Sequence, residues 1–80
     1  MGDIKAEQIV EILLTVDGWE SDISRVDNNT DLRLLGMTSL MLVIILSEVE
    51  KKFDLILHFD SVSISSLYSI EGMLKVVNRL

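Results

Sequence analysis

The sequence contains no cysteine and no proline, and its only aromatic residues are two phenylalanines, one tryptophan and one tyrosine. Without cysteine there is neither a disulfide framework nor a thiolate metal site, which fits a reducing compartment such as the cytoplasm. Because aromatic residues are scarce, the hydrophobic 49% of the chain must build a mostly aliphatic core. We expect one domain over residues 1–80, which at this size buries only about 60% of its unfolded surface.

Basic residues and long apolar runs are also scarce. Lys and Arg number 7 against 13 Asp and Glu, so the net charge is −6. Nucleic acid is a poor partner for such a chain, because binding it depends on cations that neutralise phosphates. An acidic surface suits a basic protein partner instead. The apolar run 40–46 is far shorter than the roughly 20 residues that span a bilayer, and residues 1–5 do not resemble a signal peptide.

The first helix is predicted by apolar residues that recur at intervals of three and four between residues 6 and 16. Asp3 is placed to cap its start, and Asp17-Gly18 to end it, since glycine accepts the left-handed conformation that closes helices. We expect Trp19 to fold back onto the bundle. The apolar face of this helix consists of Ala6, Ile9, Val10, Leu13 and Val16, widened by Ile12 and Leu14.

A long connection is predicted over residues 19–38, with residues 30–31 placed to cap a short helical turn over residues 32–35. A structureless loop of this length is unusual in a small domain, so we expect it to be pinned to the bundle. The spacing of its carboxylates does not match an EF-hand loop, which favours a solvated acidic loop over a calcium site. The pinning residues are predicted to be Ile23, Val26, Leu32, Leu34 and Leu35.

The second helix is predicted over residues 39–53, and its polar end sets its orientation. Ser47, Glu48 and Lys51 mark a solvent face, and successive steps of three or four positions back from them stay on that face. The outward face therefore contains Leu40, Met41 and Ile44, next to Ser39. The inward face is predicted to contain Val43, Leu46, Val49 and Phe53, helped by Leu42 and Ile45.

The C-terminal third is predicted to hold a connection over residues 54–60, a brief helix over 61–66 and a last helix that Ser69 caps. The connection is expected to bury Leu55 and Leu57, and the brief helix to be anchored by Val62 and Ile64. Gly72 inside the last helix costs about 1 kcal/mol relative to alanine, which close packing would explain. The buried stripe of the last helix is predicted to be Ile70, Met73, Leu74, Val77 and Leu80.

The order Asp31-Leu32, Leu35-Gly36-x-x-Ser39-Leu40 and an apolar helix that ends in Glu50-Lys51-Lys52-Phe53 resembles an acyl carrier protein. The resemblance implies an all-α fold, namely a small antiparallel bundle of three main helices plus one short helix, with a long loop after the first. It implies that the Ser39 hydroxyl takes up 4′-phosphopantetheine from a phosphopantetheinyl transferase. The thiol of that group then holds acyl or aminoacyl intermediates for loading and processing enzymes. We expect a monomeric carrier that is not an enzyme.

The departures from the family pattern favour a particular kind of carrier. The residue before the serine is usually acidic in the family and is Thr38 here, which still caps a helix. Met41 and Ile44 stand where carriers of fatty-acid synthesis usually have acidic residues. We therefore expect docking through apolar contact in a polyketide, peptide or other specialised pathway. The predicted docking set is Leu40, Met41, Ile44 and Glu48. By analogy with the family, a chain-sheltering interior would be lined by Ile9, Leu13, Val43, Leu46, Val62 and Leu74.

The sequence also bears on functions other than that of a carrier. A hydrolase that uses Ser39 is rejected, because Gly36-Met37-Thr38-Ser39-Leu40 is not a nucleophile elbow. The single histidine, His58, lies about 20 Å from Ser39 at 1.5 Å rise per residue. An unmodified helical adaptor that binds a protein through the apolar face of the second helix remains an alternative. An interfacial membrane binder is weaker, since the chain has no basic face.

Overall fold

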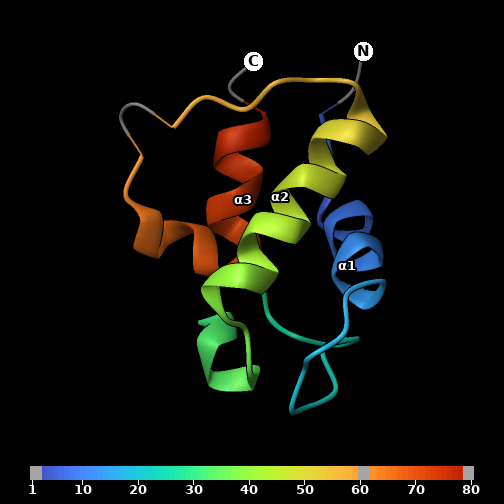
Figure 1. The fold of residues 1–80 in the computed structure, drawn as a ribbon, viewed down its shortest axis with the longest axis vertical. Helices are drawn as coiled ribbons and strands as arrows, with labels where there is room; N and C mark the ends of the chain where they lie inside the picture. Colours follow the sequence, from blue (N-terminus) through green and yellow to red (C-terminus); the bar gives the residue numbers. More distant parts are fainter. Residues whose placement is uncertain (1–2, 60–61, 79–80) are drawn as a thin grey trace.

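Helices α1 (Ala6–Leu14), α2 (Ser39–Phe53) and α3 (Ile70–Val77) pack together in a computed structural model, which describes residues 3–59 and 62–78 (Figure 1). Two short 3-10 helices, η1 (Leu32–Leu35) and η2 (Ile64–Tyr68), precede α2 and α3. The predicted all-α bundle with a long loop after its first helix is confirmed. No helix in the described ranges is long and apolar enough to cross a membrane.

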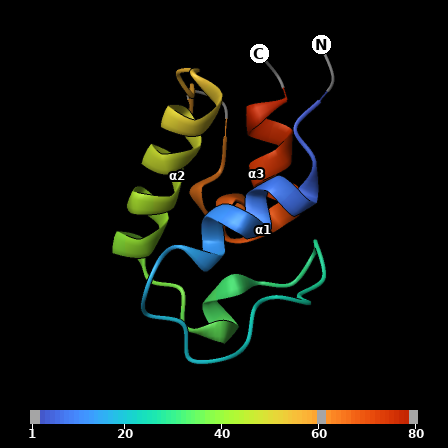
Figure 2. The same ribbon diagram turned by 90° about the vertical axis from the view of Figure 1, so that its right-hand side faces the viewer.

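The direction of the helices refines this prediction. α1 runs opposite to α2 in Figure 1, whereas α3 runs parallel to α2 because the connection after α2 returns to the other end of the bundle before η2. In Figure 2, α1 passes obliquely across the lower part of α3 with α2 beside it, and η1 and the long loop close one end. The start of α2 therefore lies at the end of the bundle that the long loop covers.

The core is aliphatic, as the composition predicts, and every helix except η2 places a side chain with no exposed surface in it. Trp19 is partly buried and packs against this core. Its Nε1 donates a hydrogen bond of 2.9 Å to the carbonyl of Leu13, which confirms that it folds back onto α1. The side chains with no exposed surface are Ile9, Leu13, Leu32, Ile45, Val49, Ile70 and Met73.

The ends of α1 differ from the prediction. Lys5 and not Asp3 is the N-cap. Residue 4 stays outside the helix because Asn78 bonds both of its backbone groups: the Ile4 N–H donates to Oδ1 at 2.9 Å and the Ile4 carbonyl accepts from Nδ2 at 3.1 Å. The helix ends at Leu14, earlier than predicted, and Gly18 (φ +117°) lies in the turn that follows.

The long loop is pinned to the bundle as predicted, with one exception. Ile23 is 2% exposed and Leu32 is fully buried, whereas Leu34 is 77% exposed, so its prediction as an anchor is wrong. A 3-10 helix has three residues per turn, which puts Leu32 and Leu35 on one side and Leu34 on another. Asp31 caps η1 by accepting the Arg33 N–H at 3.0 Å, as predicted.

The connection after α2 is extended and forms no strand over residues 55–59. Leu57 is buried, as predicted, and its N–H donates to Glu50 Oε2 at 2.8 Å. The brief helix begins later than predicted. η2 starts at Ile64, which is 68% exposed and therefore not an anchor, whereas Leu67 is 3% exposed.

The start of α3 confirms the predicted cap. Ser69 Oγ accepts the Gly72 N–H at 3.0 Å. A Cβ on Gly72 would lie 1.6 Å from the carbonyl oxygen of Ser66, so the glycine does permit close packing of η2 on α3. Leu80, which was predicted to extend the buried stripe, lies outside the described residues, as does Ser61 in the predicted brief helix.

Candidate functional site

Ser39 is the first residue of α2, and its side chain is exposed. The preceding Thr38 has the extended backbone of an N-cap (φ −105°, ψ 169°), and its Oγ1 accepts the N–H of Met41 at 3.2 Å. The first bond of the helical ladder runs from the Leu42 N–H to the Thr38 carbonyl at 3.0 Å. The N–H groups of Ser39 and Leu40 therefore lie before the ladder, at the positive end of the helix dipole.

The segment before Ser39 is held in place on both sides. Gly36 has φ +104°, and a Cβ there would lie 2.8 Å from the backbone nitrogen of Glu20, so only glycine fits. The Glu20 N–H donates to the Leu35 carbonyl at 2.9 Å. Met37 is 4% exposed, and its N–H donates to the Leu32 carbonyl at 3.1 Å. These contacts fix the direction in which the chain enters α2.

The outward face of α2 differs from the prediction at two residues. Leu40 is 68% and Ile44 is 41% exposed, in agreement with the prediction. Met41 is only 6% exposed, so its placement on the outward face is wrong, and Val43, placed inside, is 60% exposed. The error came from taking Glu48 as a marker of the solvent face, because it is half-buried at the edge of that face.

Ser47 alone would have given the right face. It is exposed, and positions three, four and seven residues before it are Ile44, Val43 and Leu40. We call Leu40, Val43 and Ile44 the apolar strip of α2. The remaining predictions for the inward face hold: Leu42, Ile45 and Val49 are buried, and Leu46 and Phe53 are partly buried.

The predicted chain-sheltering interior is wrong at Val43, which belongs to the apolar strip. Ile9 and Leu13 are fully buried, and the other three lie partly buried against the same core: Leu46, Val62 and Leu74. His58 is exposed on the connection that follows the far end of α2. That position agrees with the expectation that it takes no part in chemistry at Ser39.

Glu48 lies where the apolar strip meets the end of α1. Its Oε1 is 3.7 Å from Lys51 Nζ on the same helix. Together with Ile44 it borders a shallow groove of about 440 Å³, whose other walls are Thr15, Val16 and Asp17. The apolar strip therefore continues toward α1 and ends at two carboxylates.

The main charged feature near the start of α2 is a pair that the sequence did not single out. The Arg33 guanidinium donates from Nε to Asp31 Oδ1 at 2.9 Å and from Nη2 to Oδ2 at 2.8 Å. The side-chain and backbone hydrogen bonds from Arg33 lower the pKa of Asp31, and the Asp31 carboxylate raises the pKa of Arg33. The signal in the sequence was the Asp-x-Arg spacing at the start of a turn.

Together these features define a small helical protein that presents an exposed serine hydroxyl at the first position of an apolar helix. Residues 7–74 match a known protein family, the phosphopantetheine attachment site. The chain belongs to that family. No curated protein and no solved structure matches the chain. Domains of this family are carriers that bear 4′-phosphopantetheine as their prosthetic group and are not catalysts.

The start of α2 fits this group. Attachment needs an accessible hydroxyl and a surrounding that tolerates a phosphodiester. Ser39 supplies the exposed hydroxyl, and the first turn of α2 contains no acidic residue that would repel the phosphate. The positive end of the helix dipole favours an anion at the same place.

Proposed function

We propose that Ser39 is the attachment residue and that residues 1–80 form one carrier domain that holds acyl or aminoacyl intermediates in the cytoplasm. The observation that carries the proposal is the exposed hydroxyl at the first position of α2, inside the region that matches the phosphopantetheine attachment family. When bound, 4′-phosphopantetheine supplies the thiol that holds the cargo as a thioester. The protein itself supplies the hydroxyl, the positive helix end and a docking surface.

The docking surface in this proposal is the apolar strip of α2, with Glu48 at its edge. Three exposed aliphatic side chains side by side next to a modified serine form a surface that another protein can cover. Met41 is removed from the docking set because it is buried. The strip supports a carrier of a polyketide, peptide or other specialised pathway, since recognition through it is apolar and not acidic.

Incubation with coenzyme A and a broad-specificity phosphopantetheinyl transferase tests the attachment. We expect the intact mass to rise by one phosphopantetheine group in the wild type and not at all in Ser39→Ala. Ser47→Ala is the matched control, because Ser47 is exposed on the same helix but lies in the middle of the helix and not at its start. Modification of Ser39→Ala would assign the group to another residue.

The second candidate function is the unmodified adaptor, which the apolar strip alone would also allow. If a panel of transferases adds no mass to a folded protein, the adaptor is favoured. The pathway is tested separately with the enzymes of housekeeping fatty-acid synthesis. Chain elongation on this protein as fast as on their own carrier would contradict the assignment to a specialised pathway.

A further inference from the structure

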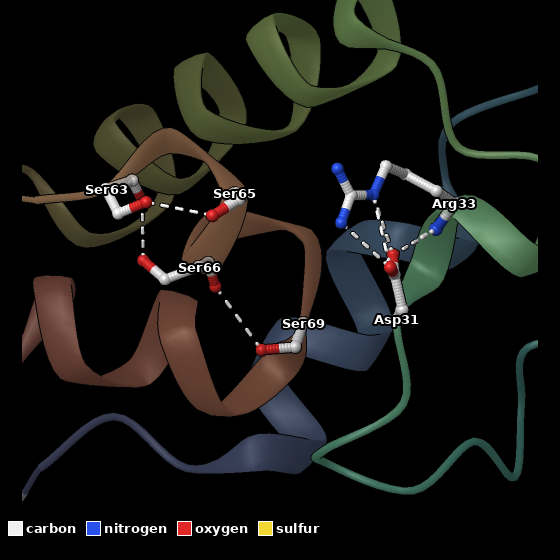
Figure 3. Close-up of polar contacts among 6 residues, drawn as sticks. All are labelled: Asp31, Arg33, Ser63, Ser65, Ser66 and Ser69. Carbon is white, nitrogen blue, oxygen red and sulfur yellow. Dashed lines mark hydrogen bonds and ion pairs between the residues drawn. The ribbon is translucent and has the colours of Figure 1, made fainter.

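Two short helices far apart in the sequence are joined by one side chain. Arg33 extends from η1, and its Cζ lies 4.7 Å from the centroid of the Tyr68 ring in η2. The guanidinium thus lies over the face of the ring, where a cation is attracted by the aromatic quadrupole. Asp31 holds the edge of the same guanidinium through the two hydrogen bonds described above (Figure 3).

Each end of this link is fixed to a different part of the bundle. On the η1 side, only three residues separate Leu35 from the first residue of α2. On the η2 side, Leu67 is buried and Gly72 lets the Ser66 carbonyl approach α3 closely. Figure 3 shows that Ser69, the cap of α3, donates from Oγ to the Ser66 carbonyl in η2 at 3.3 Å. Ser66 Oγ in turn donates to the carbonyl of Ser63, the N-cap of η2, at 2.6 Å.

We propose that the contact between Arg33 and Tyr68 is a latch that positions the start of α2 for modification. The proposal rests on the proposed role of Ser39. α2 packs mainly on α1, whereas η2 packs on α3, so a link from η1 to η2 fixes the entry into α2 relative to the rest of the bundle. The segment before Ser39 is then already ordered when an enzyme binds it, so binding does not include the entropic cost of ordering that segment.

Arg33 and Tyr68 are positioning residues in this proposal, because they act on Ser39 through the segment that precedes it. Without the latch a smaller fraction of molecules presents the competent arrangement, and apparent affinity falls by that fraction. For Arg33→Gln and Tyr68→Leu we expect the transferase KM for the carrier to rise about two- to fivefold at unchanged kcat, which corresponds to an exposed cation–π contact. The double variant should show no more than the effect of either single variant.

Conservative variants and matched controls separate the latch from general destabilisation. Arg33→Lys and Tyr68→Phe retain a cation over a ring and should be loaded like the wild type. Arg25→Gln makes the same change at an exposed arginine of the long loop, and Phe59→Leu removes an exposed ring outside η2; both should leave KM unchanged. Wild-type kinetics in Arg33→Gln and Tyr68→Leu, or an equal rise in the control variants, would overturn the latch.

If no transferase modifies the wild type, the proposed function is rejected but the latch is not. Amide hydrogen exchange then tests the latch without any modification. Met41 is a suitable reporter, because its N–H is bonded to the cap residue Thr38. We expect Arg33→Gln to speed exchange at Met41 about two- to fivefold while amides in the middle of α1 keep their rates. Unchanged exchange at Met41 in Arg33→Gln would reject the latch independently of any modification.

Discussion

The starts of α2 and α3 use the same capping chemistry and are otherwise opposites. Each follows a 3-10 helix, and in each a hydroxyl of the N-cap accepts the N–H three positions later, from Thr38 to Met41 and from Ser69 to Gly72. At the first helical position Ser39 is exposed, whereas Ile70 is fully buried. One start faces outward, and the protein covers the other.

The second helical position shows the same contrast. The N–H of Glu71 donates to the carbonyl of Asn28 in the long loop at 2.8 Å, so the protein satisfies this donor itself. Leu40, at the equivalent place in α2, is 68% exposed. Capping is therefore not what distinguishes the start of α2 from the start of α3. The useful difference is whether other parts of the chain cover the residues just after the cap.

The third helical position gives the largest expected effects. Met41 is 6% exposed and lies against Gly18, where a Cβ would meet its Sδ at 3.0 Å. Met41→Ala should lower the free energy of unfolding by about 2–4 kcal/mol, because it leaves a cavity. Val43→Ala, on the apolar strip, should cost less than about 0.5 kcal/mol. Urea unfolding measures both, and equal losses would contradict the assigned faces of α2.

Gly72 holds the equivalent position in α3, and a larger side chain there is expected to overpack the contact with η2. Gly72→Ala places a methyl group against the Ser66 carbonyl, so η2 or α3 must shift. We expect a loss of about 1–3 kcal/mol in urea unfolding, despite the better helix propensity of alanine. A more stable Gly72→Ala variant would show that η2 does not pack on α3 as described.

The two caps should contribute similar stability but differ in effect on function. Thr38→Ala and Ser69→Ala should each lower the free energy of unfolding by about 1 kcal/mol. Thr38→Ala should also slow the proposed modification of Ser39, because it frays the turn that presents the hydroxyl, whereas Ser69→Ala should not. Parallel urea unfolding and mass-based loading assays compare them. Equal loading defects in both variants would remove the distinction between the two helix starts.

The smallest expected effect is the contribution of Asp31, the cap of η1, to stability at low pH. The pKa of Asp31 is lowered in the folded protein by its hydrogen bonds from Arg33, so the carboxylate contributes stability above its unfolded pKa. That contribution is lost as pH falls through the lowered pKa, below about pH 4. Asp31→Asn should therefore flatten the decline of the urea midpoint between about pH 5 and pH 3. An unchanged decline would show that Asp31 contributes nothing to it.

The sequence determined the helices and the candidate serine because these depend on local patterns. The bounds of α2 were predicted correctly, since Thr38 caps the start and the apolar run ends at polar residues. The cap at Ser69 and the turn over Leu32–Leu35 were found by the same local signals. A hydroxyl next to a helix start needs no distant contact to be recognised.

Tertiary structure decided which residues are covered. Every residue from Leu40 to Leu46 is apolar, so periodicity did not distinguish Met41 from Val43. Only the packing of α2 on α1 and of Met41 on Gly18 did. The contact between Arg33 and Tyr68 joins positions 35 residues apart, which no local pattern predicts. The physical reason is that burial is set by the arrangement of all helices together, whereas capping is set by a few neighbouring residues.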